Sequence, residues 1–144
     1  MTAANPGASA SFQELSEDRC KELLASHTSG RVAWQASDGP LILPVTYGFY
    51  NGMVAFRTAP YGVLAELTRP TNVAFEIDEI DHAAGHGWSV LVRGRAKAVT
   101  QNFDLVTLWK MDNILPWASG TRNLFIAIEP RSITGRSVRA PFAT

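Results

Sequence analysis

The dipeptide Asn51-Gly52 restricts the fold of this chain more than any other feature of its sequence. It separates two apolar runs, LILPVTYGFY before it and MVAFRT after it. Both residues tolerate positive φ, which a two-residue hairpin turn requires, and Asn-Gly between apolar runs is therefore a strong hairpin signal. We expect residues 41–50 and 53–58 to form an antiparallel pair.

Further segments have the apolar, β-branched character of strands. They cover residues 31–35, 72–78, 88–99 and 124–130, with a last extended piece at 132–138. Short helices are expected from Ser16 to just before Gly30, around 62–68, and from Asn102 to Trp109. A doubly wound parallel sheet would need a helix after nearly every strand. The pattern instead predicts a mainly β protein, a six-stranded antiparallel barrel, closed or half-closed, with short flanking helices.

Two residues inside the strand-like runs predict irregular pairing. Pro44 has no N–H to donate, so its strand should lie at an edge or contain a bulge that exposes the backbone of Val45 and Thr46 to a ligand. Gly94 lies in the middle of the longest run and predicts a bend or bulge, which a curling barrel needs.

The first helix has clear sequence signals. Ser16 is in position to cap it, and Cys20, Leu23 and Leu24 form one apolar face. Gly30 is expected to end it. A cysteine on an apolar helix face is more often a buried core residue than a nucleophile, because reactive thiols need a cationic and partly exposed environment.

Composition limits the class of protein. The 144 residues suit a single domain, and 46% hydrophobic and 18% charged residues are ordinary for a globular chain. Zero net charge argues against a nucleic-acid partner, and no apolar run is long enough to span a membrane. One cysteine fits a reducing compartment. We expect a cytoplasmic protein with a disordered tail at 1–11, which lacks the features of a secretory signal, and one domain at 12–144.

The junction between residues 53–58 and the second expected helix is the leading candidate site. Arg57 presents a planar fork of donors that suits phosphate, and Thr58 adds a hydroxyl. Backbone N–H groups at the helix start near Gly62 could complete an anion site. The alternative is structural: Arg57 ends an edge strand and Thr58 caps a helix.

Other candidates are less specific. Trp88, Trp117, Tyr47 and Phe49 could form the apolar walls of a site for a planar cofactor, or they could belong to the core. Arg122 could supply a second cation to a phosphate or a substrate acid.

Histidine spacing suggests metal binding only superficially. His82 and His86 are four residues apart, but Gly85 interrupts the segment and no third ligand is evident. We therefore predict no metal site. No nucleophile motif is present, and the sequence identifies no catalytic acid or base.

Taken in order, several segments resemble the pyridoxamine 5'-phosphate oxidase-like superfamily, and within it the small actinobacterial, nitroimidazole-resistance-type members. These segments are GRVAW, LPVTYGFYNGMVAFRTAPYGVLAEL, NVAFEIDEID, GWSVLVRGRAKAV, PWASGTR and IEPRSITGR. The resemblance covers roughly residues 15–138. It implies a split β-barrel that forms a homodimer and binds two FMN molecules at the subunit interface.

The resemblance also implies which residues meet the flavin. The strand at 44–47 would run along the ring, Arg57 and Thr58 would lie by the ribityl phosphate, and the loop at 117–122 would reach across from the partner subunit. The implied cofactor-binding residues are Val45, Thr46, Tyr47, Arg57, Thr58, Gly62, Val63, Trp88, Ser89, Trp117 and Arg122.

One departure from the family pattern affects the phosphate site. Relatives usually carry Gly-Ser-Lys in the turn that opens the helix, whereas this chain has Tyr61-Gly62-Val63. The turn thereby lacks a hydroxyl and a full positive charge. A charge-assisted hydrogen bond contributes about 1.5–3 kcal/mol, so losing one weakens binding by roughly tenfold to a hundredfold.

Three functions are compatible with these observations. The first is an FMN-dependent oxidoreductase that acts on a small or planar substrate. The second keeps the fold but binds a deazaflavin coenzyme or haem, with Arg93 and Arg95 near an acidic tail. The third is a non-catalytic protein that sequesters flavin or senses a small molecule.

Overall fold

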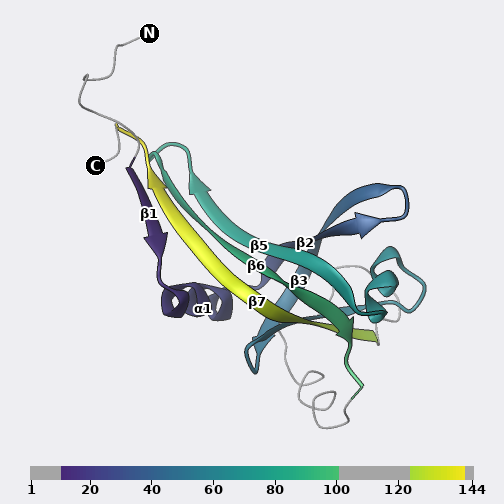
Figure 1. Cartoon of the computed structure of the whole chain (residues 1–144). Helices are drawn as coiled ribbons and strands as arrows, with labels where there is room; N and C mark the ends of the chain where they lie inside the picture. Colours follow the sequence, from purple (N-terminus) through teal and green to yellow (C-terminus); the bar gives the residue numbers. More distant parts are fainter. Residues whose placement is uncertain (1–10, 101–123, 142–144) are drawn as a thin grey trace.

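A single antiparallel sheet dominates the computed structural model, which describes residues 11–100 and 124–141 (Figure 1). In this part of the chain the strands are β1 (Ser11–Leu15), β2 (Ser29–Ala36), β3 (Gly39–Tyr50), β4 (Met53–Thr58), β5 (Thr71–Asp81), β6 (His86–Ala98) and β7 (Leu124–Arg139). The helices are α1 (Glu17–Ser26) and the 3₁₀ helix η1 (Val63–Thr68). The sheet order is β1-β7-β4-β3-β2-β5-β6, and an additional β6–β7 pairing closes it. The predicted antiparallel split barrel is confirmed, with seven described strands rather than six.

β7 closes the barrel. Residues 124–128 pair with β4, while residues from 126 to the end of the strand pair with β6. The register with β6 shifts between Arg93, opposite Ser132, and Gly94, opposite Pro130, so that β7 contains one extra residue. The bulge predicted at Gly94 is thus confirmed, and the two extended pieces expected at 124–138 are one bent strand.

The β3–β4 hairpin forms as its turn residues require. Asn51 has φ 50° and Gly52 has φ 76°, and Tyr50 pairs directly with Met53 across the turn. Pro44 lies opposite Arg31 of β2 in a stretch of β3 with which no other described strand pairs, because β4 pairs with β3 only from Tyr47 onward. The predicted edge position is confirmed, and the β2–β3 register runs without a bulge.

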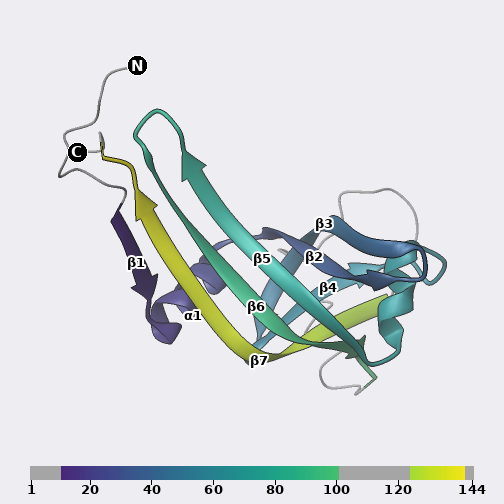
Figure 2. The ribbon, with the colours of Figure 1, turned by 45° about the horizontal axis from the view of Figure 1, so that its top comes forward.

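Three expected boundaries are wrong. The stretch at 79–87 between the strands expected at 72–78 and 88–99 is mostly strand, since β5 and β6 pair as far as Asp81 and His86 and project beyond the barrel beside the end of β7 (Figure 2). α1 ends at Ser26, not at Gly30, which lies within β2 where an added Cβ would overlap the Phe75 ring. β1 was not expected and starts one residue inside the predicted tail; it pairs with the end of β7.

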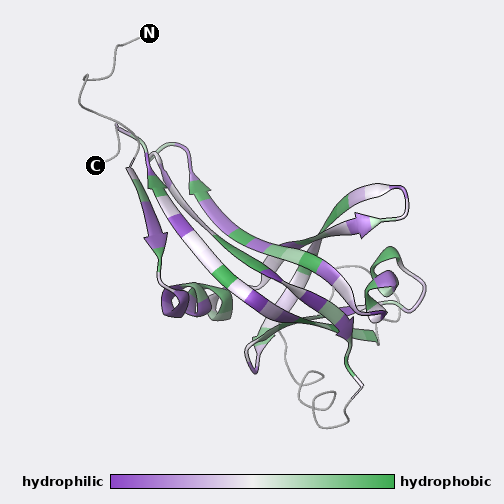
Figure 3. Ribbon diagram, viewed as in Figure 1, coloured by the Kyte–Doolittle hydropathy of each residue, from purple (hydrophilic) through white to green (hydrophobic). Residues whose placement is uncertain are grey.

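The core lies inside the barrel and under α1. Hydrophobic and polar residues alternate along the strands, as Figure 3 shows by colour. The Ser16 side chain caps α1 by accepting a hydrogen bond from the Arg19 N–H at 3.1 Å. Cys20, Leu23 and Leu24 are buried as predicted, and burial raises the pKa of the Cys20 thiol, which is unfavourable for a nucleophile.

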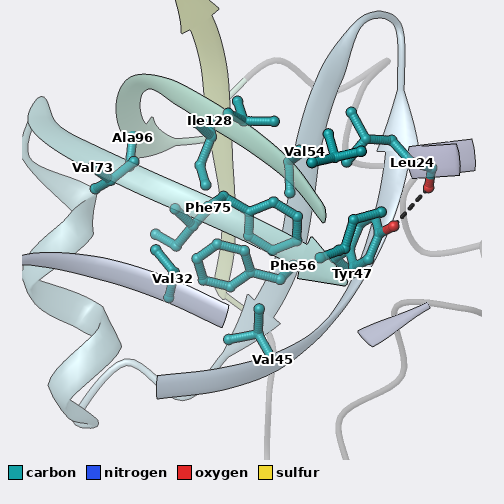
Figure 4. Packing of buried hydrophobic residues seen from close by; sticks show 14 of the residues in the cluster. Leu24, Val32, Val45, Tyr47, Val54, Phe56, Val73, Phe75, Ala96 and Ile128 are labelled. Atoms are coloured by element: carbon teal, nitrogen blue, oxygen red, sulfur yellow. Dashed lines mark hydrogen bonds between the residues drawn. The ribbon is translucent and has the colours of Figure 1, made fainter. Parts of the chain in front are cut away.

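Tyr47 ties the barrel to α1. Its side chain is fully buried, and its hydroxyl donates to the Leu24 carbonyl at 2.7 Å (Figure 4). Its ring contacts Phe75 edge-on, with centroids 4.8 Å apart. This bond satisfies a carbonyl in the last turn of α1, where no intrahelical donor follows.

Among the described residues, no helix has the length and apolar character needed to cross a membrane. The helix expected from Asn102 to Trp109 lies outside the described residues.

Gly94→Ala tests the closure of the barrel. A Cβ at this position would overlap the Glu129 carbonyl oxygen, a backbone atom that cannot move without disturbing the β6–β7 ladder. We expect a loss of about 1–3 kcal/mol or more in the free energy of unfolding, measured by urea denaturation. Gly62→Ala is the matched control, because its Cβ would meet the nearest atoms at 3.8 Å. Equal stability of the two variants would contradict the proposed packing.

Candidate functional site

The β4–η1 junction, residues 57–63, places a cation and a hydroxyl on opposite faces of one strand end. The Arg57 guanidinium is half-buried and lies over the Phe125 ring of β7, 5.5 Å from its centroid. Partial burial lowers the pKa of Arg57, but an arginine starts so far above neutrality that it stays charged. A guanidinium that has lost part of its hydration is well prepared to bind an anion.

Two buried hydroxyls in this region have no hydrogen-bond partner. Among the described residues, the buried side-chain polar atoms that lack a hydrogen-bond partner are Thr46 Oγ1 and Thr58 Oγ1. Thr58 is only 1% exposed. An unsatisfied buried hydroxyl costs roughly 1–3 kcal/mol. Such atoms in a native structure call for a physical reason, and an absent ligand with acceptor oxygens is one.

Thr46 and Arg57 each follow the last pair of the β3–β4 ladder at this end, which is Tyr47 with Phe56. Both side chains point to the outer face, because Tyr47 and Phe56 beside them point into the core. A hydroxyl and a guanidinium therefore lie on the same face of the barrel.

The turn that leads from β4 to η1 folds back against Thr58. Gly62 N–H donates to the Ala59 carbonyl at 3.2 Å, and a Cβ added to Gly62 would lie 3.8 Å from Thr58 Oγ1. Tyr61 and Val63 on either side of Gly62 are 97% and 52% exposed. The expected helix is a six-residue 3₁₀ helix, so its start is a weaker anion site than an α-helix would be.

The three consecutive β3 residues predicted to meet the flavin differ in what they can offer. Val45 and Tyr47 point into the core, and burial raises the pKa of Tyr47. Their side chains are engaged there, and the Tyr47 N–H donates to the Thr28 carbonyl at 2.9 Å. Thr46, between them, points outward with its unsatisfied hydroxyl.

Trp88 and Ser89 form a second group near the tip of the β5–β6 hairpin. Trp88 packs on the core side and meets the His27 ring edge-on at 4.9 Å. Ser89 points to the outer face, opposite Asp78 and Arg136. Both residues line a cavity of about 510 Å³ that includes none of the residues of the β4–η1 junction.

The two groups lie apart within one chain. Ser89 pairs with Asp78, the Asp78 carboxylate contacts Arg31 at 2.9 Å, and Arg31 pairs with Pro44, two residues before Thr46. These are three strand-to-strand steps, roughly 14 Å along the sheet. Trp117 and Arg122 lie outside the described residues.

The structure also shows partners that the sequence did not reveal. Phe125 lies under Arg57 only because β4 pairs with β7, across a long separation in sequence.

Arg31 bridges Glu76 at 2.6 Å and Asp78 on the outer face, and these bonds raise the pKa of Arg31. Burial, with a hydrogen bond to Asp78, raises the pKa of Glu76 despite Arg31. The sequence held one signal for this cluster: Glu76 and Asp78 are two residues apart in β5, so their side chains lie on the same face of the sheet.

His82 and His86 end up at the tight turn between β5 and β6, with His86 paired to Asp81. In residues 11–100 and 124–141, no group of three metal-ligating side chains is close enough to hold an ion.

Comparison with known proteins gives the family of this chain. A family model described as pyridoxamine 5'-phosphate oxidase matches residues 16–137. The chain belongs to this family. The uncharacterised protein Rv0080 of Mycobacterium tuberculosis is 30% identical over 98% of this chain and 95% of its own length. The matched residues 16–137 include both groups of candidate residues described above.

Solved structures show the same split barrel. A putative pyridoxamine 5'-phosphate oxidase from Corynebacterium glutamicum matches with a TM-score of 0.76 and 29% identity over 97% of each chain. An FAD-binding protein from Mycobacterium smegmatis matches with a TM-score of 0.74 and 32% identity, over 88% of this chain and 98% of its own. A putative 5-nitroimidazole antibiotic resistance protein from Bacteroides thetaiotaomicron, at 15% identity and a TM-score of 0.70 over 91% of this chain and 90% of its own, shares the fold.

Tyr47→Phe tests whether Tyr47 supports the fold or touches the ligand through its side chain. The variant removes the bond to Leu24 and leaves that buried carbonyl unsatisfied, so we expect a loss of about 1–3 kcal/mol in unfolding free energy. Flavin affinity of the folded variant should stay unchanged, as measured by fluorescence titration. Weaker flavin binding at unaltered stability would show a direct ligand contact instead.

Proposed function

We propose that this protein binds a flavin through its FMN moiety between two copies of the chain and acts as a flavin-dependent oxidoreductase on a small or planar substrate. One observation carries the proposal: the buried, unpartnered hydroxyl of Thr58 belongs to the residue next to the Arg57 cation at a strand end. The M. smegmatis relative described as FAD-binding supports a flavin in this fold.

The residues present fit a phosphorylated ligand. Arg57 can donate two parallel hydrogen bonds to phosphate oxygens, and the Thr46 hydroxyl, whose side chain also points to the outer face, can donate one more. The Thr58 hydroxyl lies on the opposite face of β4. A flavin supplies the electron or hydride transfer when bound, and the protein's part is to hold and orient it. The β3 edge around Pro44 offers backbone groups of Thr46 to a ring lying along the strand, since the Tyr47 N–H donates to the Thr28 carbonyl on the β2 side.

A second copy of the chain would bring both residue groups to one flavin. Within a single chain, Ser89 lies three strands away from Thr46, and Trp88 and Ser89 point to opposite faces. A second chain can present its hairpin and its cavity to the β4–η1 junction of the first. We propose a homodimer on this ground, and a cytoplasmic location, which suits the free and buried Cys20.

Direct titration of the purified protein with FMN tests the proposal. We expect saturable quenching of flavin fluorescence, and a dimer by sedimentation velocity. Parallel titrations with a deazaflavin coenzyme and with haem address the alternatives: tighter binding of either would replace the flavin in this proposal. A bound flavin that quinones and nitroaromatics cannot reoxidise would favour a sequestering or sensing role over catalysis.

Arg57→Ala should weaken FMN binding by roughly tenfold to a hundredfold, because a charge-assisted hydrogen bond contributes about 1.5–3 kcal/mol. Arg19→Ala is the matched control, since Arg19 lies on the exposed face of α1 and pairs with Glu22. The dissociation constants are compared by fluorescence titration. Equal values for the two variants would place the phosphate elsewhere.

Val63→Lys should strengthen FMN binding by about tenfold, because it adds a cation to the β4–η1 junction. Ile42→Lys adds the same charge at another exposed apolar position and should leave the affinity unchanged. Unchanged or weaker binding by Val63→Lys would mean that the turn does not face phosphate. A gain in both variants would indicate only a general electrostatic effect.

A further inference from the structure

The ends of β5, β6, β7 and β1 form an arm that projects beyond the barrel (Figure 2). α1 lies against one face of this arm, since a Cβ added at Gly135 would meet Cys20 Sγ at 2.7 Å. The neighbours of Gly135 in β7, Thr134 and Arg136, therefore point away from α1, and both are exposed. We call this side of the arm its outer face.

Opposite charges stand at equal distances on either side of Ser89, which lies on β6 in the middle of the outer face. Ser89 pairs with Asp78 of β5 and with Arg136 of β7. Arg136 also lies opposite Glu14 of β1, but it forms no ion pair with any described residue. Its guanidinium lies over the Phe12 ring, 5.7 Å from the centroid. The charge of Arg136 is therefore available to a carboxylate of another molecule.

Asp78 lies in a cluster with an excess of negative charge. The carboxylates of Asp78 and Glu76 share the Arg31 guanidinium, at 2.9 and 2.6 Å. Burial and the hydrogen bond to Asp78 raise the pKa of Glu76, although Arg31 acts in the opposite direction. One guanidinium thus faces two carboxylates, and a second cation beside Asp78 would be favourable.

Apolar side chains also stand at equal distances from β6. Gly87 pairs with Ile80 of β5 and with Val138 of β7, which are 61% and 40% exposed. Because Gly87 has no side chain, it leaves a gap between them, and all three residues line the cavity of about 510 Å³. Val138 pairs in turn with Phe12 of β1, which is 57% exposed. Single exposed hydrophobic residues are ordinary, whereas a contiguous row of them indicates a contact surface.

This pattern makes the outer face complementary to itself. A two-fold axis along β6 sets the β7 side of one arm against the β5 side of the other. Arg136 of one chain then faces Asp78 of the other, and Val138 of one faces Ile80 of the other. A two-fold interface requires such a match, because the same patch serves both chains. A partner with a single sign of charge would match only half of the face.

We propose that two copies of the chain pack through the outer faces of their arms, with the two-fold axis along β6. This inference rests on the homodimer proposed above and assigns its contact surface. The Asp78–Arg136 and Ile80–Val138 contacts form twice, and apolar side chains of both arms fill the gap at Gly87. The arrangement carries β7 and β1 of each chain over β5 and β2 of the other, in the direction of the β4–η1 junction.

Charge reversal tests this contact. Arg136→Glu sets carboxylates against each other at both copies of the contact, and Asp78→Arg does the same with guanidinium groups. Each variant should raise the dissociation constant of the dimer about a hundredfold or more, measured by sedimentation equilibrium. An equimolar mixture of the two should regain the dimer, because every contact again joins opposite charges. Arg19→Glu makes the same change of charge on α1 and should leave the constant unchanged.

Cross-linking tests the position of the axis without altering any charge. Ser89 lies on the proposed axis and faces its own counterpart, across sheets that pack about 10 Å apart. Ser89→Cys should therefore give a covalent dimer with a short bismaleimide. Asp38→Cys, in the exposed turn between β2 and β3, should give none, and the buried Cys20 should stay unreactive.

The outcomes separate this inference from the proposals on which it rests. A monomeric wild-type protein would overturn the homodimer and this contact together, and titration with FMN decides the flavin site independently. A wild-type dimer that Arg136→Glu leaves intact would overturn this contact alone. The same conclusion would follow if the mixture of charge variants stayed monomeric, or if dimeric Ser89→Cys gave no cross-linked product.

Discussion

The pairing of β7 with strands on both of its sides is the interaction on which the remaining structure depends. Residues 124–128 pair with β4, and residues from 126 onward pair with β6, so one strand joins the two ends of an otherwise open sheet. The bulge opposite Gly94 makes this possible because an extra residue bends the strand. The same pairing sets Phe125 under Arg57 and brings the end of β7 beside the β5–β6 hairpin.

A barrel closed in this way holds its candidate site in a state of incomplete hydrogen bonding. Thr46 and Thr58 keep buried hydroxyls without partners, each at a cost of roughly 1–3 kcal/mol, and the buried side-chain polar atoms of the other described residues are satisfied. Acceptor atoms supplied to these hydroxyls would recover that free energy. Arg57, already partly desolvated over Phe125, adds a charge at little further loss of hydration.

Charges are few at the β4–η1 junction and tied to one another on the outer face beside it. At the junction a single guanidinium faces a neutral turn, while on the outer face between the two residue groups the charges are tied to one another, as Arg31 is to Glu76 and Asp78. The proposed dimer would set the Trp88–Ser89 cavity of one chain against this junction of the other.

Local sequence determined the parts of the structure that depend on backbone preference and alternation. Asn51-Gly52 determined the hairpin, Ser16 the start of α1, Pro44 the edge position and Gly94 the bulge, because each acts through its own φ, N–H or missing side chain. Three features depended on distant partners. β1 forms only because β7 offers an edge to a polar segment, and Gly30 joins β2 rather than ending α1 because Phe75 covers it. At the site, the sequence indicated Arg57 and Thr58 as a pair. Only the packed sheet decided that Arg57 contacts Phe125 outside the barrel and that the Thr58 hydroxyl is buried without a partner. The physical reason is that neighbouring side chains on a strand point to opposite faces, and only the tertiary structure sets what each face meets.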